Sequence, residues 1–181
     1  MELCAGGDLL SYVRRRRHLK ESVAKYIFFQ IVNGIQHCHN KKIIHRDIKL
    51  ENILLDAKGN VKICDFGVSK IVKQGEVIKD KTGTPAYIAP EVIMDKGYSY
   101  PVDVWSAGVV LYAMLEGAVP FRGEDMNELR KNILSAKYQM PEGISKEAKD
   151  LLRHILVIDP IKRYEIRDIL EHKWMHDIDQ S

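Results

Sequence analysis

The sequence predicts a mainly α-helical domain that carries one short β-hairpin. Three observations favour this fold class: a long helical pattern near the N-terminus, short β-branched runs between residues 45 and 70, and helical periodicity over most of the second half. The chain has 181 residues, of which 45% are apolar and 29% are charged. These values are typical of an ordinary globular domain.

The first long helix is expected over residues 23–38, where apolar side chains recur four residues apart. Ser22 is a candidate N-cap for it. Two short strands are expected at residues 52–55 and 60–64. Residues 56–59 read Asp-Ala-Lys-Gly, a turn signal that would join these strands into a hairpin.

Helical periodicity resumes near Pro101. The expected helices cover residues 102–116, 126–135, 146–157 and 166–171. Gly117, Gly143 and the Asp159-Pro160 pair are expected to end helices or to lie in loops. Residues 104–115 carry no charge, but a run of 12 residues is too short to cross a bilayer. We therefore expect this helix to lie at the centre of the protein.

Charge and cysteine usage argue against several classes of protein. The chain has 28 Lys and Arg against 25 Asp and Glu, and a net charge of +3 does not indicate a nucleic-acid or membrane partner. Three scattered cysteines without a Cys-x-x-Cys pair indicate neither a disulfide framework nor a zinc site. The N-terminal residues lack the pattern of a secretory signal. We expect an intracellular, cytoplasmic protein, with the nucleus left open.

Two further patterns have structural explanations. The arginines at residues 14–17 could form a nuclear signal or a docking patch for an anionic partner, but a solvated helix end is the simpler interpretation. The run His37-Cys38-His39 resembles a metal tract. Consecutive residues on a helix point about 100° apart, so these side chains cannot close on one ion.

Two motifs flank the expected hairpin. The first reads His-Arg-Asp-Ile-Lys-Leu-Glu-Asn from His45, and the second reads Asp-Phe-Gly after the second strand. Four of their polar side chains would emerge at one end of the hairpin: Asp47, Lys49, Asn52 and Asp65. Two carboxylates, an amide and an ammonium group suit metal-assisted phosphoryl transfer, because Mg²⁺ prefers hard oxygen ligands.

These motifs resemble those of the eukaryotic protein kinases of the serine/threonine type, closest to the calcium/calmodulin-dependent kinases. Further matching segments are Gly83-Thr-Pro85, Ala89-Pro-Glu91, residues 103–108 and Arg163. For eight of the eleven residues in the first two motifs, leaving out Ile48, Leu50 and Glu51, chance alone gives roughly 10⁻¹⁰ per starting position. The resemblance implies a kinase-like C-terminal lobe, with ATP and Mg²⁺ as cofactors and a protein Ser/Thr hydroxyl as acceptor.

The resemblance assigns a role to each polar residue. Asp47 would accept a hydrogen bond from the substrate hydroxyl, and Lys49 would neutralise charge on the transferred group. Asn52 and Asp65 would hold the magnesium ions. Each such group would contribute about 3 kcal/mol to stabilising the transition state.

The resemblance also implies supporting roles. His45 and Phe66 would stack on each other. Asp103 would hydrogen-bond the backbone of the catalytic turn. Glu91 and Arg163 would form a buried ion pair, and removing one partner of such a pair costs about 3–5 kcal/mol.

Residues 68–87 align with the activation segment of this family. Arg46 would usually pair with a phosphate on the residue three positions before the Gly-Thr-Pro motif, and that residue is Asp80 here. We hypothesise that an Arg46–Asp80 ion pair holds the segment without phosphorylation at that position. Alternatively, Asp80 is one of several solvated charges, whose pairing adds little. Thr84 would hydrogen-bond near Asp47.

The N-terminal residues resemble the hinge of a kinase. The backbone groups of Glu2 and Cys4 would bond to the adenine, and Leu54 would underlie it. Asp8 would bond to the ribose or to a basic substrate side chain. Together with Glu51, it implies a substrate with Arg or Lys upstream of the target residue.

The resemblance covers residues 1–181 as hinge and C-terminal lobe, and the N-terminal lobe is absent. The twelve glycines show no Gly-x-Gly spacing. Two interpretations are open. The chain is a truncated catalytic domain, favoured because the C-lobe catalytic residues are intact, or it is a non-catalytic lobe that acts as a binding or scaffold module. In the first case its missing partner is an N-terminal lobe, and the chain alone should transfer negligible phosphate.

Overall fold

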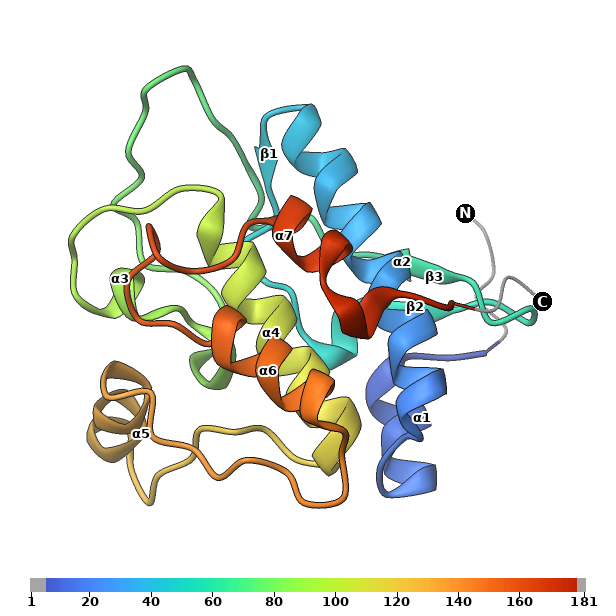
Figure 1. The fold of residues 1–181 in the computed structure, drawn as a ribbon. Helices are drawn as coiled ribbons and strands as arrows, with labels where there is room; N and C mark the ends of the chain where they lie inside the picture. The colour runs from blue at the N-terminus through green and yellow to red at the C-terminus, as the bar shows by residue number, and fades with distance from the viewer. Residues whose placement is uncertain (1–5, 179–181) are drawn as a thin grey trace.

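The structure, a computed structural model, describes residues 6–178 and is largely helical, as the sequence predicts (Figure 1). The α-helices are α1 (Leu9–Arg16), α2 (Glu21–Asn40), α3 (Pro90–Ile93), α4 (Pro101–Glu116), α5 (Met126–Leu134), α6 (Lys146–Ile155) and α7 (Ile166–Glu171). The 3₁₀ turns are η1 (Leu50–Asn52), η2 (Pro85–Tyr87) and η3 (Lys173–Met175). The expected long helices are confirmed within one or two residues at most ends. α1 ends at the arginines that were interpreted as a helix end, and α3 is additional.

The predicted hairpin forms from β2 (Ile53–Leu55) and β3 (Val61–Ile63), which pair antiparallel. Asp56 shapes its turn, because its Oδ1 accepts hydrogen bonds from the amides of Lys58 and Asn60, each at 2.8 Å. The strands are shorter than expected, since Asn52 belongs to η1.

A second antiparallel sheet was not predicted. It joins β1 (Ile43–Ile44) to β4 (Lys70–Ile71). Each strand has only two residues, so neither shows an alternating pattern in the sequence. β1 is followed by residues 45–52, which align with the catalytic loop of the kinase family and are called the catalytic loop below. β4 lies near the start of the segment 68–87, so this sheet brings the two stretches of chain together.

The start of α2 differs from the sequence prediction. The helix begins at Glu21 with Lys20 at the N-cap position, so Ser22 lies inside the first turn and caps nothing. Tertiary contacts accompany this start. The Glu21 carboxylate accepts hydrogen bonds from the backbone amide and hydroxyl of Ser145 and from the indole of Trp174, at 2.7–2.9 Å.

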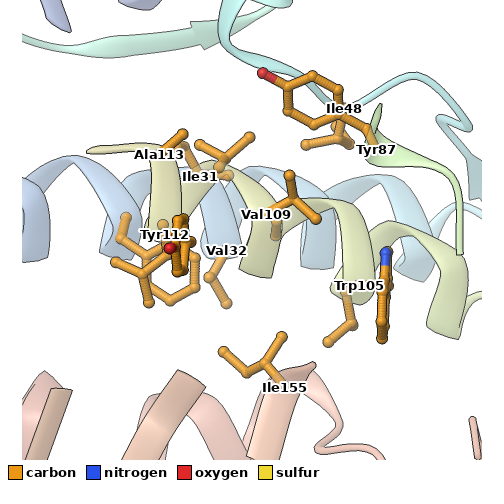
Figure 2. Packing of buried hydrophobic residues seen from close by; sticks show 14 of the residues in the cluster. Ile31, Val32, Ile48, Tyr87, Trp105, Val109, Tyr112, Ala113 and Ile155 are labelled. Atoms are coloured by element: carbon orange, nitrogen blue, oxygen red, sulfur yellow. The ribbon is translucent and has the colours of Figure 1, made fainter. Parts of the chain in front are cut away.

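Helix α4 forms the centre of the domain, and its residues from Val102 to Leu115 are buried. Figure 2 shows this helix between Tyr87 on one side and Ile155 of α6 on the other, with α2 packed alongside. Gly108 permits the close approach of α6, because a Cβ there would collide with the side chain of Ile155. In residues 6–178, no helix combines the length and the apolar character that a bilayer crossing requires.

Candidate active site

Asp103 of α4 binds the main chain of the loop after β1. Asp103 is fully buried, and its Oδ2 accepts hydrogen bonds from the His45 amide (2.9 Å) and from His39 Nε2 (2.8 Å). Its Oδ1 accepts one from the Arg46 amide (3.0 Å). Arg46 has φ +70°, a conformation that non-glycine residues adopt rarely. One buried carboxylate therefore fixes the backbone that presents the following residue, Asp47.

Four polar side chains converge above this loop. Thr84 Oγ1 donates to Asp47 Oδ1 and accepts from Lys49 Nζ, both at 2.8 Å. Lys49 Nζ lies 3.7 Å from Asp47 Oδ2. Asn52 Nδ2 donates to the carbonyl oxygen of Asp47 at 2.9 Å and lies 3.4 Å from its Oδ2. The activation segment and the catalytic loop thus meet at one carboxylate.

A main-chain hydrogen bond places Asp65 at the same end of the hairpin as this cluster. The amide of Cys64 donates to the carbonyl of Asn52 at 2.9 Å, so Asp65 follows directly at the same end of the hairpin. Its side chain is exposed, and its Oδ1 accepts a hydrogen bond from the Gly67 amide at 3.3 Å. In the described part of the chain, no hydrogen bond joins this carboxylate to the side chain of Asn52 or Asp47.

Phe66 packs against the catalytic loop. Its ring meets that of His45 edge-on, with centroids 4.7 Å apart. The other side of the imidazole is fixed as well, because His45 Nε2 lies 2.8 Å from the carbonyl oxygen of Cys64. These contacts join the two expected motifs.

The donor set at this end of the hairpin fits Mg²⁺. Asn52 uses its amide nitrogen for the Asp47 carbonyl, so its Oδ1 is the atom left to bind a cation. Asp65 offers an exposed carboxylate with one oxygen outside the Gly67 hydrogen bond. In residues 6–178, no group of three or more His, Cys, Asp or Glu side chains could hold a metal. An ion at this site would therefore keep phosphate and water among its ligands, as Mg²⁺ usually does.

Arg46 contacts the activation segment at two points. Its Nε donates to the Val68 carbonyl at 2.6 Å, and its Nη1 donates to Asp80 Oδ2 at 2.8 Å. The Arg46 side chain is 10% exposed and that of Asp80 is 60% exposed. The hydrogen bond from Arg46 holds the pKa of the Asp80 carboxyl below its usual value. The hypothesised ion pair is therefore present, and its effect on activity stays a prediction.

Glu91 and Arg163 form a two-pronged ion pair. Nη1 donates to Oε1 at 2.7 Å and Nη2 to Oε2 at 2.8 Å, and the two side chains are 4% and 0% exposed, respectively for Glu91 and Arg163. Arg163 also donates to the carbonyls of Val157 (3.0 Å) and Pro101 (2.9 Å). The pair joins α3 to the loop before α7 and to the start of α4.

The structure describes only some of the residues that were expected to contact the nucleotide. Glu2 and Cys4 lie outside the described residues. Leu54 is half-buried between buried neighbours in β2, on the strand face opposite the core. Asp8 has a role that was not predicted: it caps α1, accepting from the amide (2.8 Å) and hydroxyl (3.1 Å) of Ser11. An Asp directly before an apolar helical pattern could have indicated this cap.

Glu51 lies at the edge of the cluster. Its Oε2 is 3.8 Å from Lys49 Nζ, and 41% of its side chain is exposed. It also faces Tyr87, whose pKa is raised by burial and by the nearby Glu51 charge. The exposed part of the carboxylate can meet a basic group that approaches the cluster.

Comparison with known proteins identifies the family. Residues 1–175 match the family model described as the protein kinase domain. The chain is 47% identical over 175 residues to the serine/threonine protein kinase OSK3 of Oryza sativa subsp. indica, covering 96% of this chain and 34% of that protein.

Two other similar proteins are also named as protein kinases. The carbon catabolite-derepressing protein kinase of Secale cereale is 44% identical over 178 residues, which cover 98% of this chain and 36% of the relative. The SNF1-related protein kinase catalytic subunit alpha KIN12 of Arabidopsis thaliana is 41% identical over 177 residues, with the same coverage of 98% and 36%. The chain thus spans about a third of the length of these relatives. The match to the family model over residues 1–175 and the likeness to these kinases show that this chain belongs to the protein kinase domain family.

Proposed function

We propose that this chain forms the C-terminal lobe of a serine/threonine protein kinase, which transfers the γ-phosphate of ATP to a Ser or Thr hydroxyl of a protein. The observation that carries the proposal is the hydrogen-bonded cluster of Asp47, Lys49 and Thr84. It sets a carboxylate and an ammonium group 3.7 Å apart beside the activation segment.

Each side chain of the cluster has a distinct task in this proposal. Thr84 occupies Asp47 Oδ1, so Oδ2 is the oxygen that would accept the hydrogen bond of the substrate hydroxyl and orient it for attack. Lys49 would stabilise the negative charge that grows on the transferred phosphoryl group. Asn52 and Asp65 would hold Mg²⁺, which supplies charge neutralisation on the phosphate oxygens when it is bound.

The test is a Mg-ATP-dependent phosphotransfer assay on the protein that carries this chain together with a glycine-rich lobe. Asp47→Asn keeps the size of the side chain but removes the charge that orients the hydroxyl. We expect turnover to fall at least about a hundredfold, the usual effect of losing one preorganised group. Asp150→Asn, which alters a half-exposed carboxylate of α6, is the matched control. Equal activity of both variants would contradict the proposal.

We further propose that the nucleotide phosphates are covered by a lobe outside residues 1–181, since this sequence contains no Gly-x-Gly spacing. The 181-residue chain alone is then expected to show negligible phosphotransfer. Robust turnover by the purified chain, abolished by Asp47→Asn, would contradict this part. Specific protein binding without any phosphotransfer in the two-lobed protein would instead favour a scaffold module.

Glu51 is the basis for a proposed preference for Arg or Lys upstream of the target residue. Its half-exposed carboxylate lies beside Lys49, whereas the Asp8 carboxylate is engaged in capping α1. Glu51→Gln should therefore raise KM for a basic peptide more than KM for the same peptide with Ala in place of Arg. The closeness to calcium/calmodulin-dependent kinases stays a prediction, since the relatives named above are SNF1-related and OSK-type kinases.

Asp80 is proposed to replace the activating phosphate. Its carboxylate already supplies the negative charge that Arg46 binds at 2.8 Å. If this is correct, Asp80→Lys lowers activity of the two-lobed protein, and phosphatase treatment of the wild type does not. Unchanged activity of Asp80→Lys would refute the idea.

A further inference from the structure

Tyr98 lies in the loop between α3 and α4 and contacts the activation segment. The residue is only 6% exposed. Its hydroxyl group donates to the main-chain carbonyl of Asp80 at 2.6 Å and accepts from Arg46 Nη1 at 3.3 Å. A single phenol oxygen therefore contacts both residues of the exposed ion pair.

The backbone of the same loop is paired with the activation segment. The amide of Ile78 donates to the carbonyl of Tyr98 at 3.0 Å, and the amide of Tyr98 donates back at 2.9 Å. Gly97, with φ +75°, lets the two stretches of chain approach, because a Cβ there would collide with Val77. The phenol thus belongs to an anchored element rather than to a free loop.

The geometry closes a ring. Arg46 Nη1 bonds to the Asp80 carboxylate, the main chain of Asp80 bonds to the Tyr98 hydroxyl, and that hydroxyl bonds back to Arg46 Nη1. An ion pair with one partner 60% exposed has little strength by itself. The Tyr98 hydroxyl restricts the main chain of Asp80 independently of the ion pair. Less conformational entropy is then lost when the Asp80 carboxylate pairs with Arg46.

We propose that Tyr98 is a positioning residue that holds Asp80 against Arg46 and thereby orders the activation segment over the catalytic loop. The effect of this order on catalysis rests on the proposed kinase function, but the order itself is measured without ATP or substrate. Within residues 6–178, no hydrogen bond joins Tyr98 to Asp47 or Lys49, so Tyr98 would act through Asp80 and Arg46.

The test is Tyr98→Phe, which removes one oxygen atom and keeps the ring. Amide hydrogen exchange is measured residue by residue, together with exchange of the Arg46 Nε–H that bonds to Val68. We expect exchange at residues 76–82 and at Arg46 Nε–H to quicken about 3- to 10-fold, the factor for one hydrogen bond of typical net strength. Exchange in α2 and α4 should change no more than in the control.

The matched control is Tyr112→Phe. The Tyr112 hydroxyl also donates to a main-chain carbonyl at 2.6 Å, that of Gln139, and neither residue belongs to the activation segment or to the Arg46–Asp80 pair. It therefore reports what the loss of such a bond does to general stability. Unchanged exchange at residues 76–82, or a uniform rise across the molecule equal to that of Tyr112→Phe, would overturn the proposal.

A second variant keeps the test decisive if Tyr98→Phe does not fold. Asp80→Ala removes the exposed carboxylate but leaves the main-chain carbonyl that Tyr98 binds. If Tyr98 orders the segment, the amide of Ile78 stays protected to within about threefold of wild type, less than the factor for one lost hydrogen bond. Loss of that protection would mean that the ion pair alone orders the segment. If hydrogen exchange responds as expected but the two-lobed protein transfers no phosphate, the proposed kinase function is wrong and the role of Tyr98 in ordering the segment stands.

Discussion

The two ion pairs that fix the activation segment differ in how they are built. Just after the segment, Glu91 and Arg163 form two parallel hydrogen bonds, and their side chains are 4% and 0% exposed. Within the segment, Asp80 bonds to one nitrogen of Arg46, and the Asp80 side chain is 60% exposed. The same chemistry is thus part of the core in one pair and part of the surface in the other.

Burial decides what each pair can do. A buried charge is stable only while its partners satisfy it, because its removal from water costs several kcal/mol. Arg163 meets this demand with Glu91 and with main-chain carbonyls. An exposed pair exchanges with water and is screened by salt, so it can be broken without unfolding the domain. The first pair is therefore expected to govern stability and the second to govern the local order of the segment.

The largest effect is expected from Arg163→Ala. This change leaves the Glu91 carboxylate buried and unpaired, and should lower the free energy of unfolding by about 3–5 kcal/mol. Urea denaturation followed by circular dichroism measures it. Lys162→Ala, at the exposed neighbouring position, is the control and should have almost no effect. If both variants unfold at the same urea concentration, the contrast between the two pairs is wrong.

The local motifs explain how much of the site could be predicted. Asp47, Lys49 and Asn52 lie within six residues, so their convergence follows from one loop before one hairpin. Asp65 is farther along the chain, and the predicted hairpin placed it at the same end as the loop. Thr84 is farther still, and only the family resemblance linked it to the loop. The structure places Thr84 in the cluster and leaves Asp65 beside it without a side-chain hydrogen bond to it.

Contacts across long sequence separations that lie outside the family motifs could not be predicted. Glu21 bonds to Trp174, 153 residues away, and this contact rather than Ser22 accompanies the start of α2. The role of Tyr98 depends on a main-chain bridge to Ile78, and two residues of extended chain have no pattern of their own. Long helices were predicted well because their periodicity is local.

An intermediate effect is expected from Glu21→Gln, which sharpens the comparison with a half-buried carboxylate. Burial alone would raise the pKa of Glu21, but hydrogen bonds from Ser145 and Trp174 outweigh it and lower the pKa. Because the group is partly exposed, we expect the free energy of unfolding to fall by only about 1 kcal/mol.

The dependence of this effect on pH has a defined sign. A lowered pKa means that the stabilisation by Glu21 is fully present above the ordinary carboxyl pKa, and is lost as the pH falls through the lowered value. The difference in unfolding free energy between wild type and Glu21→Gln should therefore shrink on acidification. Glu142→Gln, an exposed change, is the control. A difference that grows as the pH falls would contradict the assignment.

The smallest effect on global stability is expected from Asp80→Asn. The carboxylate is at the surface, so the urea midpoint should match that of wild type. Exchange at the amides of Asp80 and Lys81 should quicken, while the Ile78 amide, which bonds to the Tyr98 carbonyl, stays within about threefold of wild type. Arg46 lowers the pKa of Asp80, so its contribution to order is present above the ordinary carboxyl pKa, about 4, and disappears as the pH falls through the lowered value. The wild-type and variant segments should therefore differ at neutral pH and become alike in acid. Added salt should also reduce their difference, because an exposed pair is screened. A shift of the urea midpoint as large as that of Arg163→Ala would show that the two ion pairs belong to one cooperative unit.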